Sequence, residues 1–127
     1  MDELAQEPPS QTDGCGTFSV ASWNIRSGRN AGLESALRSM ASCGVDLGIL
    51  QETKLTRNIY TRSSAGYRVV ATEAVSASQG GVALFWRESN FFEVEEVVKY
   101  GPNVIAVQVV TADDQYYIVG CYTPPMI

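Results

Sequence analysis

The stretch VDLGILQETKL, residues 45–55, decides the fold because a near-continuous apolar run changes abruptly into a polar cluster. An apolar run of this length is typical of a strand that is covered on both faces of a sheet. The cluster Gln51-Glu52-Thr53-Lys54 would then stand at the carboxyl end of that strand. The sequence therefore predicts that a buried strand carries Glu52 to one end of a sheet.

The residues before this strand predict a parallel strand-helix-strand unit. The stretch TFSVASWNI, residues 17–25, indicates a strand that leads into a polar loop at Arg26. In residues 33–43 the apolar side chains recur at the spacing of an amphipathic helix of about three turns, which Gly44 ends. A crossover of this kind joins parallel neighbours, so Asn24 and Glu52 would lie side by side at two strand ends.

The remaining sequence indicates short strands after a polar stretch, residues 53–66. The connections between them are turn-like, and their spacing of about 12 residues favours antiparallel hairpins. We expect an α/β fold, a layered domain with a mixed β-sheet, over residues 17–127. Residues 1–16 are expected to form a disordered N-terminal arm. The expected strands cover residues 67–72, 80–86, 92–98, 103–110 and 115–122.

Composition excludes several kinds of site. The 127 residues include no histidine, so Ser-His-Asp and Cys-His schemes cannot be completed among them. The three cysteines lack C-x-x-C spacing, which argues against a zinc site or a disulfide framework. No apolar run reaches the roughly 18 to 20 residues of a membrane span, and the N-terminus is acidic. We expect an intracellular protein, nuclear or cytoplasmic, without a membrane partner, in which any catalysis uses carboxylates and a metal.

Charge is spread unevenly along the chain. The net charge is −5, but residues 23–62 hold six basic against three acidic side chains. Local charge governs the attraction of phosphates because salt screens charges beyond about 10 Å. An acidic total therefore does not exclude a polyanionic substrate, although scattered solvated charges explain the pattern equally well. The bases are Arg26, Arg29, Arg38, Lys54, Arg57 and Arg62, and the acids are Glu34, Asp46 and Glu52.

The two predicted strand ends carry the candidate site residues. A hard cation such as Mg²⁺ takes oxygen ligands, and Glu52 can supply one from a rigid strand end. The Asn24 amide can hydrogen-bond a phosphate oxygen, and Arg26 can contact a phosphate from the first loop. Lys54 shares a side with Glu52 if the chain stays extended. The alternatives are a solvated carboxylate at Glu52, a turn-capping Asn24 and a solvated Lys54.

The order of these motifs resembles the N-terminal half of the endonuclease/exonuclease/phosphatase superfamily. The similarity is carried by ASWNIRSG, VDLGILQETKL, GYRVV, GGVALFW and VGCYTPP, in that order. WNIRS and YTPP look most similar to the apurinic-endonuclease-like domain of non-long-terminal-repeat retrotransposon polyproteins. The resemblance implies a sandwich of two mixed sheets with flanking helices. It also implies a phosphodiester hydrolase that depends on Mg²⁺ or Mn²⁺ and acts on DNA.

The resemblance also implies a role for individual residues. Glu52 matches the metal-binding glutamate, and Asn24 matches an asparagine beside the metal and the scissile phosphate. Tyr122 matches a tyrosine that contacts the phosphate in the apurinic branch. Lys54 matches a basic position that often follows the glutamate. At Arg26 some relatives have an acidic or amide residue, which argues against a second metal ligand there.

Two motifs of the superfamily are not found in these 127 residues: Gly-Asp-x-Asn and a C-terminal Ser-Asp-His. Their aspartates and histidine help to activate water, so we expect an N-terminal part that is inactive alone. We also expect one uncovered apolar sheet face, which would self-associate or pair with a complementary C-terminal half. The alternatives are a non-catalytic module that binds nucleic acid or a partner, and a phosphomonoesterase of the same superfamily.

Overall fold

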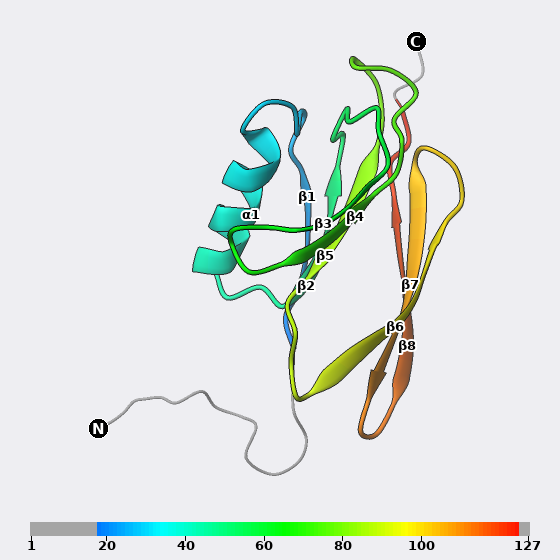
Figure 1. Ribbon diagram of the computed structural model, residues 1–127. Coiled ribbons are helices and arrows are strands. Elements are labelled where there is room, and N and C mark those ends of the chain that lie inside the picture. Colours follow the sequence, from blue (N-terminus) through cyan, green and yellow to red (C-terminus); the bar gives the residue numbers. More distant parts are fainter. Residues whose placement is uncertain (1–17, 125–127) are drawn as a thin grey trace.

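Two β-sheets and one helix make up the part of the chain that the structure describes, residues 18–124 of a computed structural model (Figure 1). The mixed strands and the helix confirm the predicted α/β class. The predicted arm, residues 1–16, lies outside the described residues. The elements are β1 (Val20–Asn24), α1 (Gly32–Ser42), β2 (Leu47–Gln51), β3 (Ile59–Arg62), β4 (Arg68–Ala71), β5 (Val82–Trp86), β6 (Phe92–Lys99), β7 (Val104–Thr111) and β8 (Gln115–Cys121).

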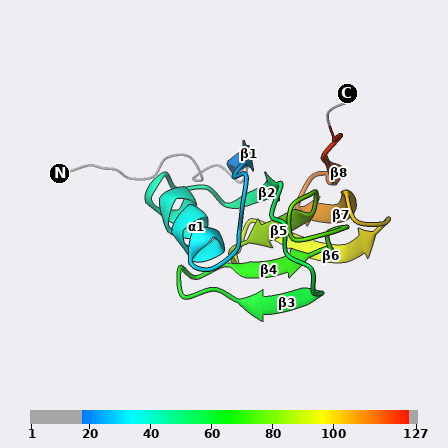
Figure 2. The same ribbon diagram turned by 90° about the horizontal axis from the view of Figure 1, so that it is seen from above.

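The larger sheet has the strand order β1-β2-β5-β4-β3, with β1 and β3 at its edges (Figure 2). Strands β1 and β2 are parallel because α1 returns the chain to its starting edge, whereas the other neighbours are antiparallel. Asn24 pairs with Gln51 at the carboxyl ends of β1 and β2. The predicted crossover is confirmed, and Glu52 follows directly after the second strand end.

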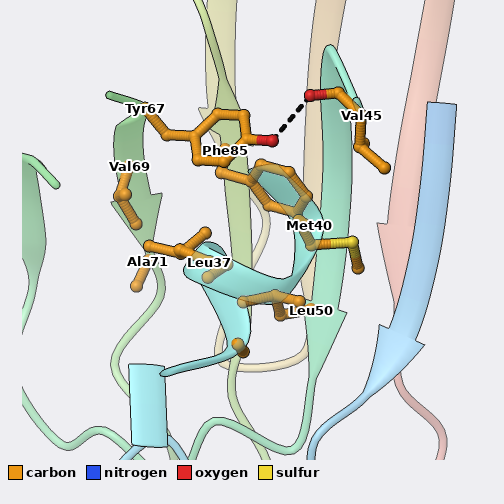
Figure 3. Packing of buried hydrophobic residues seen from close by; sticks show 10 residues of the cluster. Leu37, Met40, Val45, Leu50, Tyr67, Val69, Ala71 and Phe85 are labelled. Carbon is orange, nitrogen blue, oxygen red and sulfur yellow. Dashed lines mark hydrogen bonds between the residues drawn. The ribbon is translucent and has the colours of Figure 1, made fainter. Parts of the chain in front are cut away.

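Helix α1 covers one face of the larger sheet. Its buried stripe, Ala36, Leu37 and Met40, packs with side chains from β2, β4 and β5, including Leu50 and Phe85 (Figure 3). Burial of a Leu, Met or Phe side chain contributes about 1.5 to 3 kcal/mol to the stability of the fold. The helix stripe was predicted from the sequence. Helix α1 covers the face of β2 that is opposite the second sheet.

A polar cluster closes this core at the amino end of β2. The Tyr67 hydroxyl donates to the Val45 carbonyl at 2.6 Å, and the Arg87 Nη2 donates to the same oxygen at 2.7 Å. The guanidinium also lies 5.4 Å from the centre of the Tyr67 ring and 3.5 Å from an Asp46 carboxylate oxygen. These contacts satisfy buried polar groups far from the other end of the strand, where Glu52 lies.

The smaller sheet, of order β6-β7-β8, packs on the opposite face of the larger one (Figure 1). Ile105 and Val107 of β7 are buried with Ile49 and Leu84 of the larger sheet. Gly120 of β8 lies so close that a Cβ atom there would stand 2.5 Å from Cγ2 of Ile49. The absence of a side chain at residue 120 therefore allows β8 to approach β2.

Three expectations from the sequence differ from the structure. Both sheets of the sandwich form within residues 18–124, so the face between them is covered; the apolar side chains that remain exposed include Tyr117 and Val119 of β8. Only one helix flanks the sheets in the described residues. Strand β3 lies inside the stretch expected to be irregular, because an edge strand with one half-buried residue, Ile59, has little apolar pattern.

Among residues 18–124, no helix combines the length and the apolar character that a membrane crossing requires.

We predict that Gly120→Ala lowers the free energy of unfolding by about 1 to 3 kcal/mol, because the added methyl group overlaps Ile49. Urea denaturation of the 127-residue chain measures this loss. In an Ile49→Ala background the same substitution should lower the free energy of unfolding much less, because the side-chain atoms of Ile49 that the added methyl group would overlap are absent. Val119→Ala, at an exposed neighbouring position, is the control and should change stability by less than about 0.5 kcal/mol. An equal loss in both backgrounds would contradict the proposed steric origin.

Candidate functional site

The carboxyl ends of β1, β2 and β8 meet at one end of the sandwich, at the top of Figure 1. The main-chain N–H of Ile25 donates to the Gln51 carbonyl at 3.0 Å and thus continues the β1–β2 ladder beyond Asn24. The loops that follow also touch, since the Gly28 N–H donates to the Thr53 carbonyl at 2.7 Å. Asn24 and Glu52 are therefore brought to one edge by their backbones, as the sequence predicted.

The chain turns sharply as it leaves β2. Glu52 has a φ of +58° and Lys54 a φ of +56°, a left-handed conformation that side chains other than glycine rarely adopt. Thr53 between them is fully buried. The chain does not stay extended here, so the condition under which Lys54 would share a side with Glu52 is not met. The half-buried Lys54 lies on the turn that follows the strand end.

The main chain of Gly80 and Gly81 holds this turn in place. The N–H of Thr53 donates to the Gly81 carbonyl at 3.2 Å, and the N–H of Lys54 donates to the Gly80 carbonyl at 2.8 Å. Backbone strain of this kind persists where the surroundings determine the conformation, and it is common at functional sites. Sequence reasoning used the Gly-Gly pair only as part of the motif GGVALFW and gave it no role at the site.

Tyr122 reaches the same place from the smaller sheet. It is half-buried directly after β8, and its pKa is raised by loss of hydration and by the negative charge of the nearby Glu52 carboxylate. The structure thus brings together two residues from opposite sheets that only the family resemblance had linked. We call Asn24, Glu52 and Tyr122 the strand-end site.

Asn24 closes the turn at the start of the first loop. Its Oδ1 accepts the main-chain N–H of Arg26 at 3.1 Å, and Arg26 has a φ of +65°. The Oδ1 of Asn24 therefore caps the turn, as the turn-capping alternative expects. The other half of the amide, the NH₂ group, carries two donors and can still bond a phosphate oxygen.

Four of the six bases counted in the sequence lie on the two loops that meet here. Arg26 and Arg29 follow β1, whereas Lys54 and Arg57 follow β2. The other two lie elsewhere: Arg38 is on α1, and Arg62 on β3 has a guanidinium nitrogen 3.9 Å from a carboxylate oxygen of Glu88. Four bases that are separated in the sequence therefore lie on two adjoining loops.

The oxygen donors fit a hard cation only in part. No group of three or more His, Cys, Asp or Glu side chains that could hold a metal lies within residues 18–124. A cation such as Mg²⁺ is often bound through one or two carboxylates, with waters and substrate phosphate oxygens as the other ligands. Glu52, with the Asn24 amide beside it, suits a metal whose coordination the substrate and water complete.

Comparison with known proteins finds a matching protein family. Residues 21–124 match the model of the endonuclease/exonuclease/phosphatase family. The match begins in β1 and extends beyond β8, so it includes Asn24, Glu52 and Tyr122. A search of curated proteins finds no match.

We predict that Glu52→Gln lowers the pKa of Tyr122 toward its ordinary value. The substitution removes the negative charge that disfavours the phenolate, while loss of hydration still raises the pKa. Titration of the ¹³Cζ signals of labelled tyrosine measures the change. The signal of Tyr116, whose pKa is raised mainly by Asp114, is an internal control, and Glu73→Gln is the matched control variant. An unchanged Tyr122 titration would show that the two side chains do not face each other in solution.

We also predict that Glu52→Gly is more stable than Glu52→Ala by about 1 kcal/mol, because glycine adopts a positive φ without strain. Chemical denaturation measures the difference. At Arg57, where φ is negative, the order should reverse, with the alanine variant more stable by about 0.5 kcal/mol. The same order at both positions would argue against a left-handed Glu52.

Proposed function

Because the chain belongs to the endonuclease/exonuclease/phosphatase family, we propose that the strand-end site is the metal-binding and phosphate-binding part of a phosphodiesterase. One observation carries the proposal: the carboxyl ends of β1, β2 and β8 lie at one end of the sandwich, which brings Asn24, Glu52 and Tyr122 to the same place from both sheets. A carboxylate, an amide and a phenol at one point supply a cation ligand and two kinds of hydrogen-bond donor. Such groups suit a phosphate that is bound to a metal.

Each residue has a separate task in the proposed site. A bound Mg²⁺ or Mn²⁺ supplies a Lewis acid that polarises a phosphoryl oxygen and acidifies a coordinated water. Glu52 is its protein ligand, with the Asn24 amide beside it. The NH₂ of Asn24 and the hydroxyl of Tyr122 donate to phosphate oxygens and so orient the phosphate. Arg26 and Lys54, on the adjoining loops, offset the negative charge of a longer substrate.

We propose DNA as the substrate, in a site of the type found in retrotransposon endonucleases. The sequence features that favour this class are WNIRS at residues 23–27 and YTPP at residues 122–125. The four bases on the two loops suit a polymer with several phosphates better than a substrate with one. A phosphomonoesterase remains the alternative within the family, since a fold does not determine the substrate.

The proposal separates binding from turnover. The 127 residues contain no histidine, and the described residues hold no group of three or more His, Cys, Asp or Glu side chains that could bind a metal. A positioned base for the attacking water is therefore not supplied by these side chains. We expect metal-dependent affinity for DNA with little or no cleavage. The second candidate function, a non-catalytic nucleic-acid module, shares the affinity but does not need Glu52.

We predict that the 127-residue chain binds a short double-stranded DNA more tightly in Mg²⁺ or Mn²⁺ than in chelator, and that Glu52→Ala removes this difference. Fluorescence anisotropy measures the binding, and nicking of supercoiled plasmid measures turnover in the same buffers. Glu73→Ala, at an exposed carboxylate after β4, is the matched control. Arg26→Ala and Lys54→Ala should weaken binding and reduce its dependence on salt concentration.

The outcomes distinguish the alternatives. DNA affinity that is the same with and without metal, and the same in Glu52→Ala as in wild type, would favour the non-catalytic module. Competition by p-nitrophenyl phosphate that exceeds competition by bis(p-nitrophenyl) phosphate would favour the phosphomonoesterase. Metal-dependent nicking that Glu52→Ala abolishes would support a phosphodiesterase but contradict the separation of binding from turnover. No metal-dependent affinity at all would overturn the proposal.

A further inference from the structure

Asn103, at the turn between β6 and β7, contacts both sheets beside the strand-end site. Its side-chain Oδ1 accepts the main-chain N–H of Gly81 at 3.0 Å. Its main-chain carbonyl accepts the N–H of Tyr122 at 3.0 Å. A single residue of the smaller sheet thus holds the start of β5 in the larger sheet and the residue that follows β8.

The contact with Gly81 leads directly to the strained turn. Gly81 accepts the N–H of Thr53, and Gly80 accepts the N–H of Lys54, so the two carbonyls hold the residues that follow Glu52. There is no space for another side chain between these parts. A Cβ atom on Gly80 would stand 2.6 Å from Oδ1 of Asn103, and one on Gly81 would overlap the Thr53 hydroxyl oxygen.

A second contact fixes the turn on which Asn103 lies. The buried Thr72 hydroxyl donates to the Pro102 carbonyl at 2.6 Å, and the Thr72 Oγ1 accepts the N–H of Val82 at 3.1 Å. The residue before Asn103 is therefore anchored to the larger sheet next to Gly81. With the turn fixed on this side, the Asn103 side chain is directed at the Gly80–Gly81 segment.

We propose that Asn103 is a positioning residue that sets the Glu52 turn and Tyr122 against each other across the two sheets. It acts through Gly81 on one side and through its own main-chain carbonyl on the other, and it does not itself contact the metal or the phosphate. Strained conformations such as that of Glu52 persist only where neighbouring contacts determine them. The consequence for metal binding rests on the proposed function, whereas the positioning itself does not.

Native-state amide hydrogen exchange of the 127-residue chain tests the positioning. In Asn103→Ala the amides of Thr53, Lys54 and Tyr122 should lose roughly tenfold more protection than the amide of Ile49 in the middle of β2. Asn103→Asp keeps an acceptor oxygen for Gly81 and should restore protection at Thr53 and Lys54. If Asn103→Ala does not fold, Asn103→Ser, whose hydroxyl reaches less far, replaces it.

The control is Tyr67→Phe, which removes a buried hydrogen bond at the opposite end of β2. In Tyr67→Phe, protection of the amides of Thr53, Lys54 and Tyr122 should fall only as much as protection of the Ile49 amide. Equal loss at all four amides in Asn103→Ala, or no restoration by Asn103→Asp, would overturn the positioning role and leave Asn103 as a purely structural residue.

Titration with Mn²⁺, followed by electron paramagnetic resonance, tests the chemical consequence. Wild type should bind Mn²⁺, Glu52→Ala should not, and Asn103→Ala should bind about tenfold more weakly, as is typical when a group that supports a ligand is removed. Absence of binding by wild type would overturn the proposed function, while the exchange result still decides the role of Asn103. Equal affinity of wild type and Asn103→Ala would overturn the link between positioning and metal binding.

Discussion

The close approach of Gly120 to Ile49 is the constraint on which the rest of the molecule depends. It brings β8 onto β2 at a point three residues before Glu52 and two residues before Tyr122. Both strands run toward the same end of the sandwich (Figure 1). The separation of β2 and β8 at Gly120 therefore determines how near the residues that follow these strands lie to each other. A rigid sandwich core positions two side chains that no local contact along the chain could bring together.

The strand-helix-strand unit could be predicted because its residues obey simple patterns. The stripe of α1 has helical spacing, and β2 is apolar on both faces since α1 covers one and β7 and β8 cover the other. From these patterns alone the neighbouring positions of Asn24 and Glu52 follow. Strand β3 could not be found in this way, because only Ile59 of its four residues is even half-buried.

The remaining features of the site depend on contacts between elements, which periodicity does not describe. Neither Glu52 nor Lys54 favours a positive φ, and their conformation is determined by carbonyls of Gly80 and Gly81 that lie far away in the sequence. Alternation along β8 indicates which side chains share a face but not which strand they meet. Tyr122 entered the candidate set through family resemblance, and the fold places it at the same end of the sandwich as Glu52. The net charge of the chain includes exposed glutamates on β6, namely Glu93, Glu95 and Glu96. It therefore does not describe the local charge of the loops that carry the bases.

The separation of Glu52 and Tyr122 in the sequence has a consequence for biosynthesis. The larger sheet and α1 consist of residues that emerge from a ribosome before those of β8, the last strand described. Contacts between distant residues are slow to form because a long loop must close before they contribute. A nascent chain can therefore complete its first hydrophobic core while the strand-end site does not yet exist, and any affinity that depends on Tyr122 appears only after β8 has docked.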